Sequence, residues 1–97
     1  MKLTDLELCK KVAEIEGYSS RWRECLFLFV SGKDSLLGGR LLLDLMFKHE
    51  VVIDWHEGGS GCTYIVNRIE ESFVKVEYKS KPDLPRAILE CIVEANS

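Results

Sequence analysis

The feature that most constrains the fold is a series of three short segments in the second half of the chain. Apolar and polar residues alternate along Val51–His56, and Cys62–Asn67 and Phe73–Tyr78 have the composition of strands. The glycine-rich run Glu57–Gly61 separates the first two segments, and a polar turn around Arg68–Ser72 separates the last two. Short turns of this kind join neighbouring antiparallel strands. The sequence therefore predicts a three-stranded antiparallel meander.

A helix is predicted on either side of this sheet region, at the two ends of the chain. Thr4 and Glu7 have the spacing of a capping box, and Gly17 is placed to end the helix that they begin. At the other end, Asp83 can cap a helix over the following residues, with Pro85 in its first turn. Both segments repeat apolar residues at helical spacing, so we expect each to pack one face on a core.

The middle of the chain predicts a strand followed by a buried helix. Glu24–Ser31 is apolar on both alternating sets, which is typical of a central strand covered on both sides. Asp34 or Ser35 can cap a helix that runs to about Lys48 and is apolar around most of its circumference. Gly38-Gly39 would cost such a helix about 1 kcal/mol per glycine relative to alanine. Either the helix begins after them, or the backbone approaches another element there.

These elements predict one domain, residues 1–97, of the α+β (α/β) class. The expected order is α-β-α-β-β-β-α, a layered α-β-α sandwich whose sheet is largely antiparallel. Lys and Arg number 13 against 16 Asp and Glu, a net charge of −3, which argues against direct binding of nucleic acid. The four cysteines are far apart and no export signal or membrane span is apparent, so we expect reduced thiols, a cytoplasmic location and no membrane contact.

Three stretches carry a resemblance to a known family. They are Glu7–Gly17, the pair Asp34–Ser35 leading into Leu41–Ile53, and Pro85–Ala95. Together they resemble the phage ABA sandwich domain proteins, which are small accessory proteins of phages and prophages. The resemblance implies a layered α/β fold and a viral origin. It implies no activity and no catalytic residues, because the family has none established.

No group of residues has the spacing of a known catalytic or metal site. His49, His56 and Cys62 are of types that bind zinc, but they match no finger or ribbon pattern, and we expect no metal and no cofactor. The glycines of Glu57–Gly61 precede a strand, whereas a phosphate loop precedes a helix, so a hairpin tip is the favoured interpretation.

A catalytic arrangement is the least favoured alternative. A base such as His56 would need a nucleophile at Cys25, Ser60 or Cys62 and a third group to hold it, for which Asp54 is available two residues away. We therefore do not expect an enzyme, although one using His56, Asp54 and Cys62 stays open.

The residues predicted to contact a partner combine one basic–aromatic cluster with acidic groups. An aromatic side chain between two arginines is typical of a protein contact, although Trp22 can instead simply pack under the predicted strand. Acidic side chains can compete for a basic groove on another protein. The predicted set is Arg21, Trp22, Arg23, Asp54, His56, Glu57, Glu70 and Glu71.

The function predicted on these grounds is non-catalytic binding of a host protein by a phage-encoded protein in the bacterial cytoplasm. An anti-defence role, such as inhibition of a CRISPR effector, would suit a small acidic protein of this class. The alternative is a structural or assembly protein that acts as a homodimer through an exposed strand edge or an apolar helix face.

Overall fold

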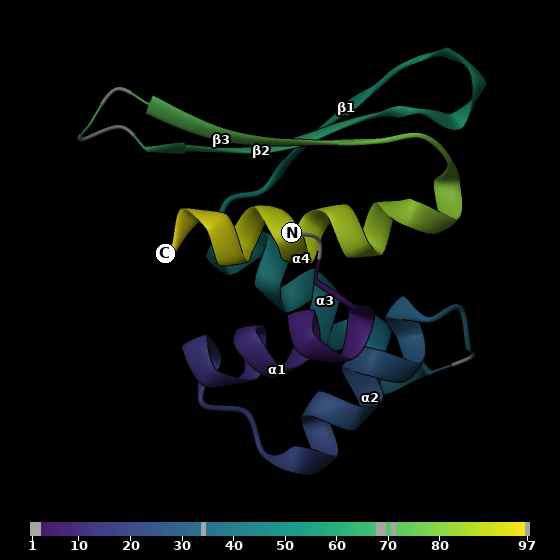
Figure 1. Cartoon of the computed structure of the whole chain (residues 1–97), viewed down its shortest axis with the longest axis vertical. Coiled ribbons are helices and arrows are strands. Elements are labelled where there is room, and N and C mark those ends of the chain that lie inside the picture. The colour runs from purple at the N-terminus through teal and green to yellow at the C-terminus, as the bar shows by residue number, and fades with distance from the viewer. Residues whose placement is uncertain (1–2, 34, 68–69, 71, 97) are drawn as a thin grey trace.

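Four helices and a three-stranded antiparallel sheet form the structure, a computed structural model that describes residues 3–33, 35–67, 70 and 72–96. In chain order the elements are α1 (Asp5–Glu16), α2 (Ser20–Val30), α3 (Leu36–Lys48), β1 (Val52–Trp55), β2 (Gly61–Asn67), β3 (Ser72–Tyr78) and α4 (Leu84–Ala95), with single 3₁₀ turns at Glu57–Gly59 and Lys81–Asp83. All four helices lie on one side of the sheet, with α4 directly against it and α1 and α2 farther away (Figure 1). The predicted α+β class and the packing of helices on an antiparallel sheet are confirmed, but the predicted α-β-α layering is not observed, because the helices of the described residues cover one side of the sheet.

The meander is present as predicted, with β2 between β1 and β3. Ile53 of β1 and Val76 of β3 lie opposite Thr63 of β2, so these three side chains share the face that α4 covers. Thr63 is fully buried, and its hydroxyl donates a hydrogen bond of 3.2 Å to the carbonyl of Ala87 in α4. This polar contact fixes α4 across the inner face at the middle of the sheet.

The predicted strand Glu24–Ser31 is wrong, because nearly all of this segment lies in α2. The hydroxyl of Ser19 accepts a hydrogen bond from the backbone N–H of Trp22 and caps the helix. Leu26 and Val30, one helical turn apart, are both buried in the core. Since α2 packs against both α1 and α3, apolar residues occur on more than one of its sides. A short run of this kind has no periodicity that separates a buried helix from a buried strand. The order is therefore α-α-α-β-β-β-α.

Gly38 and Gly39 lie inside α3, and Gly38 packs against the backbone of α2. A Cβ atom at position 38 would overlap the carbonyl oxygen of Cys25 and lie 2.8 Å from the Cβ of Phe29. At position 39 the nearest atom would be in the Phe29 ring, 3.6 Å away, which is an ordinary contact. The second of the two possibilities that the sequence left open is the correct one: the backbones of two helices meet here.

The core lies between α4 and the other three helices. All four helices contribute large, fully buried apolar side chains to this core: Leu8, Val12, Leu26, Leu45, Ile88, Leu89 and Ile92. Burying side chains of this size stabilises the fold by about 1.5–3 kcal/mol each. These buried side chains of the four helices are therefore a major source of the stability of the fold.

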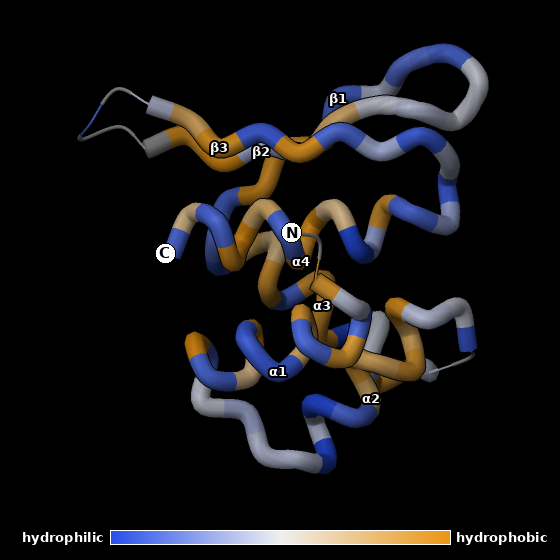
Figure 2. Tube along the Cα trace, in the orientation of Figure 1, coloured by the Kyte–Doolittle hydropathy of each residue, from blue (hydrophilic) through white to orange (hydrophobic). Residues whose placement is uncertain are grey.

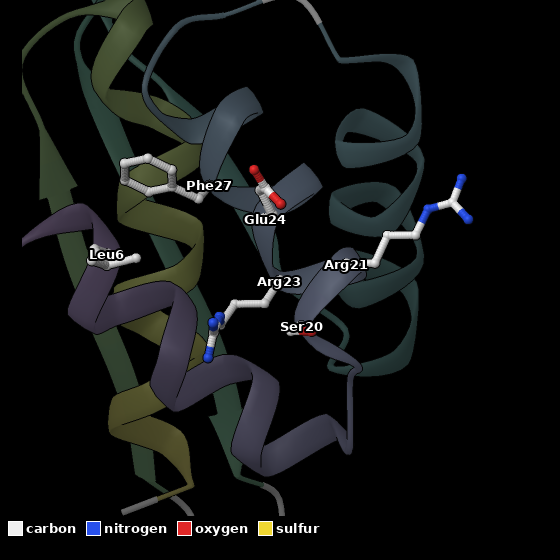
Figure 3. Close-up of a pocket in the computed structure, with 6 residues that line it drawn as sticks. All are labelled: Leu6, Ser20, Arg21, Arg23, Glu24 and Phe27. Carbon is white, nitrogen blue, oxygen red and sulfur yellow. The ribbon is translucent and has the colours of Figure 1, made fainter.

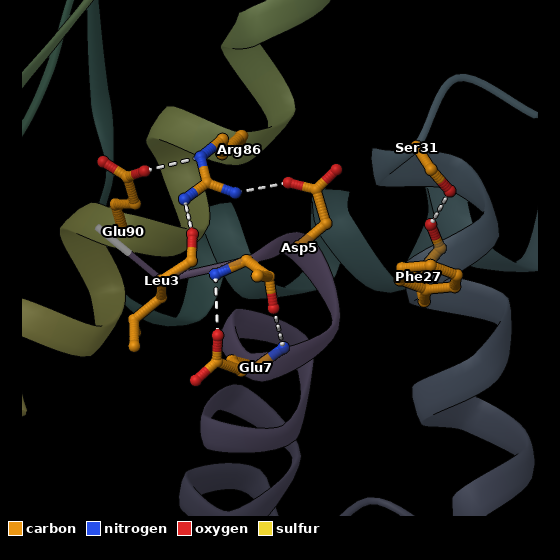
Figure 4. A network of polar contacts seen from close by, with 8 residues as sticks. Leu3, Asp5, Glu7, Phe27, Ser31, Arg86 and Glu90 are labelled. Atoms are coloured by element: carbon orange, nitrogen blue, oxygen red, sulfur yellow. Dashed lines mark hydrogen bonds and ion pairs between the residues drawn. The ribbon is translucent and has the colours of Figure 1, made fainter. Parts of the chain in front are cut away.

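Two polar clusters join elements that are distant in sequence. Arg86 in α4 donates hydrogen bonds to the carboxylate of Asp5 and to the carbonyl of Leu3, and its Nε lies 2.7 Å from Glu90 (Figure 4). These contacts hold the start of α1 against α4. The predicted Thr4–Glu7 capping box is confirmed beside them.

The second cluster ties the end of α1 to the end of α3. The carboxylate of Glu16, which is almost fully buried, lies 2.6 Å from Lys48 Nζ and 2.8 Å from His49 Nε2. Burial raises the pKa of Glu16, but the hydrogen bonds from Lys48 and His49 outweigh it, so this pKa lies below its ordinary value of 4.5.

Candidate functional site

The β1–β2 hairpin brings Asp54, His56 and Cys62 together. Asp54 and Cys62 lie directly opposite each other on the two strands, and His56 follows Asp54 by two residues. The His56 Nε2 lies 3.4 Å from Asp54 Oδ2, and the Cys62 Sγ lies 4.0 Å from the same oxygen. One side-chain atom of each residue falls within 4.8 Å of the other two. We call these three residues the hairpin cluster.

Access to the hairpin cluster differs among its members. The side chains of Asp54 and His56 are more than half exposed, whereas Cys62 is buried. The backbone N–H of His56 donates to the carbonyl of Ser60 at 3.0 Å, which closes the hairpin just beyond β1. The three residues are therefore fixed by strand pairing, but only the thiol is shielded from water.

Tyr78 lies on the opposite face of the sheet from Cys62. Its ring covers Gly61, where a Cβ atom would overlap the ring and its hydroxyl. The hydroxyl is buried and has no hydrogen-bond partner among the described residues. Burial raises the pKa of Tyr78, and the nearby Cys62 and Asp54 raise it further. The tyrosine therefore stays neutral and fills the space that Gly61 leaves.

The other residues considered for metal binding or catalysis lie elsewhere. His49 ends α3 and is paired with Glu16, so it does not join His56 and Cys62. Cys25 is in α2, and the hydroxyl of Ser60 donates to the carbonyl of Glu57 at 3.1 Å. Of the three residues of zinc-binding type in the sequence, His56 and Cys62 therefore lie together, and Asp54 rather than His49 lies beside them.

None of the four cysteines forms a disulfide, as the sequence predicted. All four thiols are free, and three of them are buried. Burial raises the pKa of Cys9 to about 12 and that of Cys91 to about 11. Because the thiolate is the reactive form, these two groups are inert core residues.

The outer face of the sheet, on the side away from α4, carries exposed apolar side chains. Residues that pair across neighbouring strands share this face. Tyr64 of β2 pairs with Val52 of β1 and with Lys75 of β3, and Val66 of β2 pairs with Phe73 of β3. Val52 is 40% exposed, Val66 51% and Phe73 65%. A groove of about 280 Å³ runs between Asp54, Cys62, Tyr64, Val66, Phe73 and Lys75. Figure 2 shows apolar residues along the strands as well as in the helical layer.

We call Val52, Tyr64, Val66 and Phe73 the outer-face patch, and none of these residues belongs to the partner-binding set predicted from the sequence. The sequence does contain a signal for this patch. Phe73 and the outward-facing residues of β2, among them Tyr64 and Val66, are apolar where a solvated face is expected to be polar. Singly exposed apolar residues are common, but a contiguous set is typical of an interaction surface.

The side chains of the basic–aromatic cluster do not all point the same way. Arg21, Trp22 and Arg23 lie in the first turn of α2, so Arg21 and Arg23 point in different directions, as Figure 3 shows. The Trp22 ring contacts the ring of Tyr18 edge-on, at 5.6 Å between centroids, and is 45% exposed. The predicted packing of Trp22 under a strand is wrong, because α2 replaces that strand.

A second groove, of about 450 Å³, lies between α1 and α2. Its lining mixes apolar and charged side chains of Leu6, Ser20, Arg21, Arg23, Glu24 and Phe27 (Figure 3). Among these, only Arg21 and Arg23 belong to the predicted partner-binding set.

The predicted partner-binding residues occupy three separate places. Arg21, Trp22 and Arg23 lie on α2, at the end of the molecule away from the sheet (Figure 1). Asp54, His56 and Glu57 lie together at the β1–β2 hairpin. Glu70 is exposed between β2 and β3, and Glu71 is outside the described residues. Of the β1–β2 hairpin residues, Asp54 lines the same groove as Tyr64, Val66 and Phe73 of the outer-face patch.

Comparisons with known proteins add no relative. No protein-family model matches the chain, and neither the curated proteins nor the solved structures contain a match. The resemblance to phage ABA sandwich proteins therefore stays a prediction. None of the helices in the described ranges combines the length and apolar character that crossing a bilayer requires.

Proposed function

We propose that this chain is a non-catalytic module that binds another protein through the outer face of its sheet. The observation that carries the proposal is the outer-face patch, where Val66 and Phe73 are more than half exposed although neither supports the core. Aromatic side chains at the centre of such a patch supply much of the affinity in protein interfaces.

The charges beside the patch favour a partner with basic side chains around an apolar centre. Asp54 and Glu57 lie at the hairpin end of the face, and Glu77 lies opposite Cys62 on β3. Lys75 is 3.8 Å from Glu77, so this lysine is partly neutralised. With the chain's net charge of −3, a second copy would be repelled weakly, whereas a basic partner would be attracted.

We propose binding rather than catalysis because the hairpin cluster lacks the enclosure that acid–base catalysis uses. The Asp54 and His56 side chains are 59% and 53% exposed. A catalytic base works best where water is excluded and a third group fixes its geometry. A bacterial host protein in the cytoplasm is the partner that the sequence resemblance favours, and anti-defence inhibition is the corresponding role.

The test compares two surfaces that each expose a phenylalanine. The immobilised chain is exposed to bacterial lysate, and a stoichiometric protein partner should be retained by the wild type. The double variant Phe73→Thr/Val66→Thr should lose it, because threonine keeps strand propensity but removes apolar area. Phe47→Gln is the matched control, since Phe47 is 83% exposed on α3.

Three results would overturn the proposal. They are the absence of any stoichiometric partner, retention of the partner by the double variant, and loss of the partner in Phe47→Gln. Light scattering on the purified chain tests whether the outer face binds a second copy of the chain instead. A dimer that Phe73→Thr/Val66→Thr converts to monomer would assign the outer face to a second copy and favour the homodimer.

A further inference from the structure

We propose that Asp54, His56 and Cys62 form a binding site for one Zn²⁺ ion at the end of the outer face. The inference is independent of protein binding and concerns the hairpin cluster alone. It rests on the distances between the three side chains, on the strand pairing that fixes them and on their combined chemistry.

The His56–Asp54 distance matches that between two ligands of one zinc ion better than that of a direct charged hydrogen bond, and the Cys62 sulfur lies somewhat farther out, with all three atoms within 4.8 Å of one another. In tetrahedral zinc sites, metal–ligand distances of about 2.0–2.3 Å place N and O ligands about 3.3 Å apart and S and O ligands about 3.5 Å apart. Here the His56–Asp54 distance is 3.4 Å and the Cys62–Asp54 distance is 4.0 Å. A direct charged hydrogen bond between His56 and Asp54 would be shorter, at about 2.7–2.9 Å.

Strand pairing places the ligands before any ion binds. Asp54 and Cys62 are opposite each other in the β1–β2 ladder, and the His56 N–H to Ser60 carbonyl bond extends the pairing by one residue. The three ligand atoms already lie within 4.8 Å of one another. Such preorganisation lowers the entropy that binding costs.

The ligand types favour zinc over calcium and magnesium. One thiolate and one imidazole suit Zn²⁺, whereas Ca²⁺ and Mg²⁺ prefer sites made of oxygen atoms. When Cys62 binds, its thiol proton is released to solvent and a sulfur–zinc bond forms. The thiolate and the Asp54 carboxylate then balance the charge of the ion, and His56 binds as the neutral ring. The fourth position is open to water, because Asp54 and His56 are exposed.

Cobalt(II) titration of the reduced full chain tests the site, because Co²⁺ replaces Zn²⁺ and its absorption reports the ligands. We expect one equivalent to bind, with a thiolate-to-cobalt charge-transfer band that Zn²⁺ then abolishes. Cys62→Ser should lose the band. Cys25→Ser is the matched control, since it removes a thiol that lies on α2.

His56→Gln provides the second arm, because this exposed side chain can be changed without disturbing the core. It should weaken Co²⁺ binding by at least about tenfold, since even residues that only support a metal ligand have effects of this size. The proposal is overturned if the wild type binds no stoichiometric Co²⁺, if Cys62→Ser keeps the band, or if His56→Gln binds as tightly as the wild type.

Discussion

The two faces of the sheet differ in what constrains their residues. On the inner face, Thr63 is fully buried, and its hydroxyl is bonded to α4. On the outer face, Phe73 is 65% exposed, and no helix in the described part of the chain covers it. Apolar residues on the inner face are explained by folding. Those on the outer face are not, which is why we assign them to binding. Substitutions in the core, at helix contacts and on the outer face should therefore differ in their effects on stability, in that order from largest to smallest.

The largest effect is expected for a core residue of α4. Leu89 is fully buried, so Leu89→Ala should lower the free energy of unfolding by about 2–5 kcal/mol, through lost burial and the cavity that remains. Urea unfolding measures it. Leu36→Ala is the control, because Leu36 is 78% exposed on α3, and it should have little effect. Equal losses for the two variants would contradict the assignment of the core.

The next effect distinguishes two adjacent glycines of α3. Gly38→Ala should destabilise the protein by about 1–3 kcal/mol, because the new methyl group overlaps the backbone of α2 at Cys25. Gly39→Ala should instead stabilise it by up to about 1 kcal/mol, since alanine favours helix and the added atom has room. Thermal unfolding of both variants checks the order. A Gly38→Ala protein more stable than wild type would rule out this helix contact.

A smaller, pH-dependent effect is expected at Glu16. Its pKa is lower in the folded protein than its ordinary value of 4.5, so the ionised carboxylate adds stability above that pH. The contribution is lost as the pH falls through the lowered pKa. Glu16→Gln should therefore cost about 1 kcal/mol at neutral pH and progressively less in acid. Urea unfolding at several pH values tests this, and a difference independent of pH would refute the assigned ion pairs.

The sequence predicted those elements whose signals are local. The Thr4–Glu7 capping box defined the start of α1, and the glycines after Glu57 defined the first hairpin. The strand prediction for Glu24–Ser31 failed because the apolar residues of this segment pack against both α1 and α3, and the sequence does not show those contacts. Gly38 was recognised as unusual, but only the position of Cys25 in space explains it.

The candidate sites were predicted in part. Asp54, His56 and Cys62 were named for chemistry, and their meeting follows from the register of β1 and β2, which alternation alone does not set. The outer-face patch was missed because alternation predicts which residues share a face of the sheet, but not which of the two faces stays uncovered. Which side of a sheet the helices cover is a tertiary property, and the single helix α4 covers only the inner side.

The smallest effect on stability, and the most direct test, is expected on the outer face. The measurement is the free energy of unfolding of Phe73→Thr/Val66→Thr in urea, beside Leu89→Ala. We predict a value within about 0.5 kcal/mol of wild type, as for substitutions at surface positions. A loss of about 2 kcal/mol or more, comparable with that of Leu89→Ala, would show that the outer face supports the fold, and would contradict its assignment as a surface kept for binding.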